Sequence, residues 1–532
     1  MTKSSLFKST LLLSSAAALL MSLPAMAETV LRRGNAAEPN TLDIHRVSGV
    51  PEANIQLDLY EGLMTYSADG KAIPGAAESY TVSPDGVTYT FKLRANAKWS
   101  DGSNVTSEDF AFAWRRILDP KTAANYAYFL DCIKNAEDIR NGKANMSTLG
   151  IETPDPKTFI VHLRAPTPYF IGMLVHHSTY PVNKALIEKI GDGYAKPGIL
   201  ITNGAYKLAE AVPQDHVTLV KNPNYHDAAN AKIDKVIFYP TEDINSELKR
   251  YQAGELETTY SIPLAEIPVQ QKQRPNEARI TPYFGTYFYA FNLTHEPWKS
   301  NKDLRYALSL AMDRDVIVKN ITQAGEIPAY SFVPPGTSNF ASWTPNEGKM
   351  SQAERDTKAK ELLAKAGYGA NKPLALELAY NTSEAHKKVA VAVAAMWKQK
   401  LGIDVNMKNQ EWSTFQAERN NKVFQDIARH GWIGDFDDAV NFLDLQRGNI
   451  GAQSTSGYQN AEFDKLLSAA TTETDLAKRA AILQQAEKIM ITDMPIIPIY
   501  FYANKNMVSP KVSGWMDNLS GFHLTRWMNL KQ

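Results

Sequence analysis

Hydrophobic and polar positions alternate with two different periods throughout this chain. Alternation at every second residue indicates half-buried strands, whereas apolar residues spaced by three and four indicate helices. The first pattern predicts strands at residues 88–93, 159–163, 205–208, 236–239, 403–407, 424–428 and 496–502. The second predicts helices between residues 106 and 119, 244 and 253, 351 and 367, 383 and 401, and 475 and 492, with two shorter helical pieces within 301–322.

Capping residues define several of these helix ends. Thr106 and Asp109 begin one helix, and Ser351 with Glu354 forms a capping box at the start of another. Gly254 and Gly402 mark two helix C-termini. Helix followed by strand, repeated, indicates an α/β fold. With 532 residues the chain is too long for one core and should divide into about two or three domains, whose boundaries composition does not reveal.

The first 27 residues have the pattern of a secretory signal. Lys3 and Lys8 precede an apolar run from Leu11 to Leu23, and Ala25-Met26-Ala27 provides a small-residue cleavage site. The apolar run is shorter than the roughly 20 residues that span a bilayer. We therefore expect cleavage after Ala27, export to a periplasm and no insertion into the membrane.

Charge and cysteine content narrow the classes of partner. The chain has 57 basic and 57 acidic residues, which favours neither nucleic acid nor an anionic membrane as a partner. Cys132 is the single cysteine, so an intramolecular disulfide is impossible. Asp435-Phe436-Asp437-Asp438 hints at calcium but lacks the glycine and the ligand spacing of a calcium loop. No metal or other cofactor is expected.

Motifs of hydrolytic enzymes do not occur in the expected mature chain. We find no His-Glu-x-x-His, Gly-x-Ser-x-Gly or Walker loop. Ser5 and Lys8 match Ser-x-x-Lys, but they lie in the signal. His176-His177 is an isolated pair expected on the surface or in the core. The sequence indicates a protein that is not an enzyme, with an exported hydrolase as the alternative from another class.

The segment Arg429-His430-Gly431-Trp432-Ile433-Gly434-Asp435 is the most informative candidate site. It places a carboxylate just beyond an aromatic ring and after two glycines, which would let a ligand backbone approach closely. A carboxylate held beside apolar groups needs a cation, because a buried unpaired charge costs several kcal/mol. A ligand ammonium could be that cation. Taken alone, the pattern is also typical of a strand end followed by a solvated turn acid.

Several ordered blocks resemble the periplasmic oligopeptide-binding proteins, the solute receptors of peptide ABC importers. Each block is a weak signal, but their order and spacing extend over nearly the whole mature chain. Besides the run from Gln410 to Asp435, the blocks are Gly49–Asn54, Asp58–Leu63, Lys98–Gly102, Glu108–Phe110, Asp119–Ala123 with Tyr126, Thr202–Tyr206, Met312–Asp315 and Tyr380–Ser383.

This resemblance implies an α/β fold with two lobes, the type II, cluster C periplasmic binding protein fold, with an additional domain and the ligand in the interlobe cleft. Domain I is discontinuous, so the chain crosses between lobes more than once, and the crossing strands form a hinge. The implied division is domain I at 28–60, 186–285 and 503–532, domain II, the additional domain, at 61–185, and domain III, the second lobe, at 286–502.

The resemblance also implies the roles of individual residues. Asp435 would receive the ligand's α-ammonium, with Tyr126 close by. Backbone groups around Gly431 and Ile433 would form an edge for strand addition, and Val50 would lie on the opposite edge. The remaining expected positions are Arg419 and His386 for ligand carboxylates at different lengths, Arg429 for a carboxylate or for an architectural ion pair, and Trp412, Trp432, Tyr260 and Tyr502 as aromatic cleft residues.

Some positions depart from the family pattern. Thr322 replaces a lysine of some relatives and Ser48 replaces an acid, so length and charge preference should differ. Two positions that form a disulfide in some relatives are Gly285 and Ile433 here. Asp437 and Asp438 stand where relatives more often carry other residues; we expect them on the surface, adding negative potential near the amine site.

The implied function is capture of a small peptide by lobe closure, followed by delivery to an inner-membrane ABC permease. The chain would act as a monomer. A murein tripeptide is the leading alternative ligand, because the aromatic block from Gly285 to Asn292 resembles that of murein-peptide receptors.

Overall fold

The computed structural model describes residues 28–531. The predicted signal and its cleavage site after Ala27 lie outside the described residues. Between residues 28 and 531, no helix is long and apolar enough to cross a membrane.

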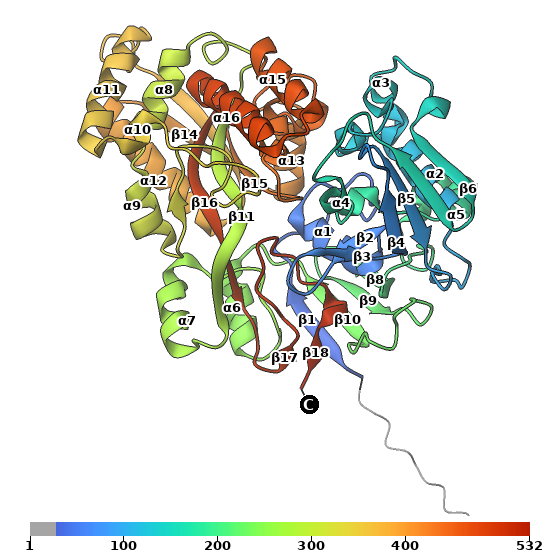
Figure 1. The fold of residues 1–532 in the computed structure, drawn as a ribbon. Coiled ribbons are helices and arrows are strands. Elements are labelled where there is room, and N and C mark those ends of the chain that lie inside the picture. Colours follow the sequence, from blue (N-terminus) through green and yellow to red (C-terminus); the bar gives the residue numbers. More distant parts are fainter. Residues whose placement is uncertain (1–27, 532) are drawn as a thin grey trace, which may run out of the picture.

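Three sheets organise the described chain (Figure 1). The largest has the order β12-β16-β11-β15-β13-β14, with β12 at Ile327–Pro328, β16 at Ile496–Met507, β11 at Ala278–Phe291, β15 at Ile427–Ile433, β13 at Ala375–Asn381 and β14 at Asp404–Gln410. The second has the order β1-β10-β9-β8, with β1 at Val30–Gly34, β10 at Lys235–Tyr239, β9 at His216–Lys221 and β8 at Tyr206–Val212. The third has the order β4-β5-β7-β6, with β4 at Ala77–Val82, β5 at Thr88–Leu93, β7 at Thr158–His162 and β6 at Ile151–Asp155. Two-stranded sheets pair β2 (Met64–Tyr66) with β3 (Ala72–Pro74) and β17 (Val512–Ser513) with β18 (Asn529–Leu530).

Helices accompany each sheet. Those of the first half are α1 (Val50–Leu59), α2 (Ser107–Leu118), α3 (Ala136–Arg140), α4 (Phe170–Met173), α5 (Lys184–Ile190), α6 (Ile244–Gln252) and α7 (Ile267–Gln273). Those of the second half are α8 (Lys302–Ala311), α9 (Arg314–Val316), α10 (Asn346–Lys349), α11 (Gln352–Lys365), α12 (Glu384–Leu401), α13 (Trp412–Asn420), α14 (Val440–Leu443), α15 (Ala461–Thr472) and α16 (Leu476–Asp493). The fully buried Trp397 joins α12 to α8, because its indole N–H donates to the Leu308 carbonyl at 2.8 Å.

The long antiparallel strands β11 and β16 connect the large sheet to the lower body of the molecule (Figure 1). Their pairing runs from Ala278↔Met507 to Ala290↔Ile496, with a register shift between Pro282 and Thr286. The boundaries predicted near residues 285 and 502 fall inside these two strands. A bulge at this place gives the pair a point at which to bend. The domain boundaries themselves stay a prediction.

Most predicted elements are confirmed. Helix α2 begins at Ser107 with a capping box formed by Thr106 and Asp109, and Gly402 ends α12 in the left-handed conformation, with φ of 72°. The strand predicted at 424–428 is displaced: β15 occupies Ile427–Ile433, so most of the candidate segment is strand. Its polar residues and Gly431 hide the alternation that identifies strands.

Candidate functional site

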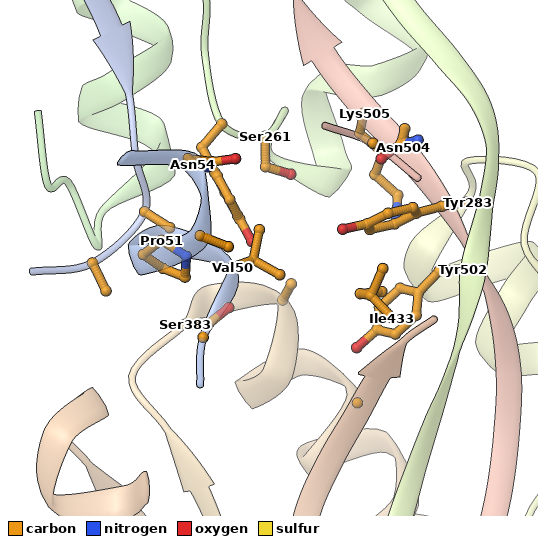
Figure 2. A pocket seen from close by; sticks show the side chains of 18 of the residues that line it. Val50, Pro51, Asn54, Ser261, Tyr283, Ser383, Ile433, Tyr502, Asn504 and Lys505 are labelled. Atoms are coloured by element: carbon orange, nitrogen blue, oxygen red, sulfur yellow. The ribbon is translucent and has the colours of Figure 1, made fainter. Parts of the chain in front are cut away.

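One cavity of about 330 Å³ lies where the large sheet meets the rest of the molecule. Figure 2 shows Val50, Pro51 and Asn54 on one side of it, facing Tyr283, Tyr502, Asn504 and Lys505 on the other. The twelve residues expected from the sequence all line this cavity: Val50, Tyr126, Tyr260, His386, Trp412, Arg419, Arg429, Gly431, Trp432, Ile433, Asp435 and Tyr502.

Strand β15 presents a partly open edge to the cavity. It pairs with β11 along its full length, from Ile427↔Phe291 to Ile433↔Gly285. On its other side it pairs with β13 only at Ile427 and Ala428. Residues 429–433 therefore keep backbone groups on that side without a strand partner in the described chain. An extended ligand can pair with such an edge by strand addition.

Asp435 is buried, with 8% of its surface exposed, so it is not a solvated turn acid. The Asn441 carboxamide oxygen accepts from the Asp435 backbone N–H at 3.1 Å and from the Trp432 indole at 2.8 Å. Because one oxygen of α14 accepts both bonds, Asn441 fixes the acid relative to the aromatic ring. Within residues 28–531, no lysine or arginine nitrogen lies within 4 Å of the Asp435 carboxylate.

His176 supplies the one charged or chargeable contact to this acid in the described chain. Its Nε2 lies 3.3 Å from Asp435 Oδ1, and only 3% of the residue is exposed. Its other ring nitrogen, Nδ1, lies 2.8 Å from the Ser178 hydroxyl and 3.4 Å from the Ser178 backbone nitrogen, so Nε2 is the nitrogen that faces the acid. The sequence left a surface or a core position open for His176 and His177. Both residues are buried, and both line the cavity.

Tyr126 lies beside this pair, with its ring centroid 4.4 Å from that of His176. Burial and, to a smaller extent, the negative charge of Asp435 raise the pKa of Tyr126, so its hydroxyl stays protonated. The acid, the imidazole and the phenol together form a polar pocket suited to an ammonium group.

Arg419 and Arg429 are two nearly buried guanidinium groups of the same cavity. Arg429 donates to the Tyr502 hydroxyl at 2.8 Å and to the Asn381 side-chain oxygen at 3.3 Å. Burial, then the charge of Arg429, lower the pKa of Arg419 to about 10. Neither guanidinium has a carboxylate within 4 Å among the described residues, so Arg429 does not form the expected architectural ion pair. Two buried guanidinium groups without carboxylate partners among the described residues are suited to a ligand anion.

His386 differs from the cation that was expected. Burial, Arg429 and Lys505 hold the pKa of His386 well below its usual value, so the imidazole is neutral at pH 7. Its buried Nδ1 has no hydrogen-bond partner in the part of the chain that the structure describes. His386 is therefore a hydrogen-bonding group, and the positive charge beside it belongs to Arg429 and Lys505.

The aromatic residues Tyr502, Trp412 and Tyr260 form walls of the cavity. Tyr502 accepts from Arg429, and Trp412 at the start of α13 lies 6.0 Å from the Arg419 guanidinium carbon. The Tyr260 backbone N–H donates to Glu247 Oε1 at 2.8 Å. These contacts orient rings toward the cavity while leaving their faces available.

Two details of backbone placement need correction. Val50 is the first residue of helix α1 and so does not lie on a strand edge, although it lines the cavity. Gly434 does not line the cavity, and a Cβ at this position would lie 2.3 Å from the Phe284 ring. This glycine is therefore required by packing against Phe284, and not by the approach of a ligand. At Gly431 a Cβ would lie 2.2 Å from the Tyr502 hydroxyl, so this glycine makes room for the Arg429–Tyr502 contact.

Asp438 is not the surface acid that was expected. Only 2% of it is exposed, and Arg479 donates to its two oxygens at 2.7 and 2.9 Å. Asp437 is exposed and accepts from Ser338. Because Arg479 neutralises Asp438, this residue adds little negative potential near Asp435.

Other family-specific positions have clear structural neighbours. Gly285 and Ile433 are directly paired, and Ile433 Cδ1 occupies the space of a side chain at position 285. Ser48 accepts from Gln416 at 2.7 Å. Within the aromatic block, Tyr287, Phe288 and Tyr289 are buried in β11 and do not line the cavity, and Tyr287 packs behind Arg429 and His386.

Sequence reasoning missed three residues of the site: His176, Asn441 and Lys505. The histidine pair and the lysine carry no local pattern, and only folding brings His176 to Asp435 and Lys505 to Glu326. Asn441 follows Asp435 by six positions and had no motif to mark it.

Comparisons with known proteins agree with this architecture. The family model of the bacterial extracellular solute-binding proteins, family 5, matches residues 71–454. The periplasmic oligopeptide-binding protein OppA of Salmonella typhimurium is 41% identical over 488 residues, which cover 91% of this chain and 89% of that protein.

Two solved relatives have the same fold. The murein tripeptide binding protein MppA of Escherichia coli superposes with a TM-score of 0.92 at 38% identity, covering 95% of this chain and 99% of that chain. Haemophilus influenzae OppA in complex with the peptide RPPGFSPFR also gives 0.92, at 37% identity with 95% and 99% covered. The unliganded open form of MppA gives 0.67 over 95% of this chain and 98% of that chain, so the lobes here are not arranged as in that open form. The chain belongs to the bacterial extracellular solute-binding proteins of family 5.

Proposed function

We propose that this protein is a periplasmic receptor that captures peptides through their free amino end and delivers them to an ABC-type import permease. The names of its relatives support this role, since they include periplasmic oligopeptide- and murein-peptide-binding proteins. The proposed location follows the same relatives, together with the predicted signal and cleavage after Ala27. The proposed state is a monomer that needs no cofactor.

One observation carries the proposal: a buried carboxylate faces the cavity, and no lysine or arginine among the described residues lies within 4 Å of it. Asp435 is 8% exposed, and its nearest chargeable neighbour in the described chain is His176 at 3.3 Å. A ligand ammonium would supply the missing positive charge through a charge-assisted hydrogen bond. Tyr126 would offer its hydroxyl to the same group.

The rest of the cavity suits a peptide backbone. The open edge of β15 can pair with ligand amides, and the unpaired Arg419 and Arg429 can receive carboxylates. Binding along one lobe followed by closure of the other would bury these contacts and shift the population toward the closed form. The chain would perform no covalent chemistry, and peptides recovered unchanged after incubation with purified protein would support this.

The amine-capture step is tested by Asp435→Asn with trialanine and N-acetyltrialanine as ligands in calorimetric titrations. For the wild type, acetylation should cost about 2–5 kcal/mol of binding free energy, because Asp435 is left buried and unpaired. In Asp435→Asn the two ligands should bind with similar, weak affinity.

Asp437→Asn is the matched control, since it removes a nearby charge outside the cavity lining and should leave both affinities as in the wild type. Equal affinities of wild type for the two ligands would contradict amine capture.

A murein peptide is the second candidate ligand. The observation that favours it is the pair of guanidinium groups without carboxylate partners, which matches a ligand carrying more than one carboxylate. Mass spectrometry of ligands released from protein purified from its native periplasm separates the candidates. A ladder of mixed peptides supports general uptake, and one dominant wall fragment supports the murein peptide.

A further inference from the structure

Lys505 is a cavity cation outside the set of expected binding residues. It lies near the end of β16, where Figure 2 shows it beside Asn504 on the wall opposite Val50. Only 11% of its side chain is exposed. Its ammonium group donates to the Ala503 carbonyl at 3.1 Å, which leaves other protons of that group free for a second acceptor.

That second contact is an ion pair with Glu326. The Lys505 Nζ lies 2.5 Å from Glu326 Oε1, and the glutamate side chain is fully buried. The contact lacks the directional geometry of a hydrogen bond, so Oε1 has no hydrogen-bond donor among the described residues. The other oxygen accepts from the Ala324 backbone N–H at 3.0 Å and is thereby fixed in place. Glu326 is therefore anchored, whereas Lys505 is held mainly by charge.

The neighbours of this pair leave room for a ligand anion. Thr322, Glu326, His386 and Lys505 all line the cavity. The Thr322 hydroxyl donates to the Val318 carbonyl within its own helical turn and carries no charge. Arg429, His386 and Lys505 line the same cavity, and both cations lie close enough to His386 to disfavour its protonation. A carboxylate extending beyond Arg429 would meet Lys505 as its next permanent positive charge.

We propose that Lys505 is a conditional carboxylate site: it stays paired with Glu326 until a ligand with a free carboxyl end reaches it. This inference rests on the proposed function as a peptide receptor. Glu326 then acts as an internal competitor. It neutralises Lys505 when the ligand is too short to reach it, and it reduces the affinity gained by a ligand whose carboxylate binds Lys505. Lys505 and Glu326 together are specificity-determining residues for the length and the charge of the ligand's carboxyl end.

Removing each partner should have opposite effects. Lys505→Met deletes the cation, so the affinity for a free carboxylate at this position should fall about tenfold. Glu326→Gln deletes the competitor and frees the lysine, so the same affinity should rise several-fold. Amidated ligands carry no terminal charge and should be nearly insensitive to both changes.

The test uses the full mature chain and six probes: tri-, tetra- and penta-alanine, each with a free or an amidated C-terminus. Calorimetry gives the acid-to-amide affinity ratio at each length for wild type, Lys505→Met and Glu326→Gln. We expect the ratio for at least one length to fall in the first variant and to rise in the second. Because the ratio is internal to each variant, a general loss of stability does not imitate this result.

Ratios that both variants leave unchanged at every length would overturn the proposal. Equal losses for acids and amides would also overturn it, because they would make the pair only a brace between β12 and β16. Failure of the proposed function has a different signature: the wild type would bind none of the six probes, and the role of Lys505 would fall with it.

Discussion

The neutral His386 illustrates how two permanent cations control a titratable group in the cleft. Burial alone disfavours its charged form, and Arg429 and Lys505 add repulsion. A ligand carboxylate placed among the three groups would reverse this effect and favour protonation. The imidazole is therefore a reporter of local charge.

Replacing Arg429 by Met should raise the pKa of His386 toward its ordinary value, because one repulsive charge is removed. NMR titration of the His386 ring measures this shift. Arg419→Met is the control, since Arg419 is not among the charges that lower the pKa of His386. An unchanged His386 titration in Arg429→Met would contradict the assignment.

Residue identities in this site were predictable only where the resemblance marked them. Asp435 and Arg429 stand in a recognisable segment, and the structure places both in the cavity. His176 and Lys505 carry no local pattern, since a histidine pair and a lysine in a strand are common everywhere. Their partners, Asp435 and Glu326, lie 259 and 179 positions away in the sequence.

At the scale of elements, helix α6 fixes one wall of the cavity through a buried acid. Glu247 accepts from the Tyr260 N–H, and its carboxyl group is fully buried. Burial raises the pKa of Glu247 to about 8. The folded state therefore binds a proton that the unfolded state releases above about pH 4.5, so stability should decrease as the pH rises from about 4.5 to 8.

Glu247→Gln should remove this dependence while keeping an acceptor for Tyr260. We expect the variant to gain on the order of a few kcal/mol over the wild type at pH 8 and to match it near pH 4.5. Thermal unfolding at several pH values tests this. Parallel pH profiles for the two proteins would contradict a buried, protonated Glu247.

The loop after β15 depends on a single buried ion pair. Asp438→Asn should destabilise the protein by about 3–5 kcal/mol, because it leaves the Arg479 charge buried without its partner. The adjacent Asp437→Asn is a natural control and should change stability by less than about 0.5 kcal/mol. Denaturant unfolding gives the free energy of unfolding of both variants. Similar values for Asp438→Asn and Asp437→Asn would contradict the conclusion that only Asp438 forms a buried ion pair.

Helix ends were predictable from local chemistry, whereas the position of β15 was not. Capping residues at Thr106 and Ser351 act within one turn, so their effect is visible in sequence. The candidate strand carries Arg429, His430 and Gly431, whose placement depends on β11 and Tyr502 rather than on alternation. Long-range packing decided its register.

At the scale of the whole molecule, contacts across the cleft hold the described arrangement. Gln416 on α13 donates to Ser48 at 2.7 Å and accepts from Asn40, and the Tyr66 hydroxyl donates to the Asp435 carbonyl at 3.3 Å. These bonds join residues that are more than 360 positions apart in the sequence. They can form only when the lobes approach each other.

Gln416→Ala should shift the unliganded protein toward an open arrangement, because it removes bonds made only on closure. We expect a larger radius of gyration by small-angle X-ray scattering without ligand, the same radius with saturating trialanine, and affinity lowered a few-fold. Gln484→Ala, which removes a bond within one lobe, should change neither quantity. A Gln416→Ala variant as compact as the wild type would contradict the role of this contact.

Under the proposed function, the lack of a lysine or arginine beside Asp435 in the described residues has a consequence for transport. Closing the cavity without a ligand would bury the Asp435 carboxylate with no arginine or lysine among residues 28–531 to offset its charge, which disfavours an unliganded closed form. This cost opposes the bonds that Gln416 and Tyr66 make across the cleft, so a ligand ammonium would shift the balance further toward the closed form. A permease that recognises the closed form would therefore hydrolyse ATP mainly when the receptor carries a ligand.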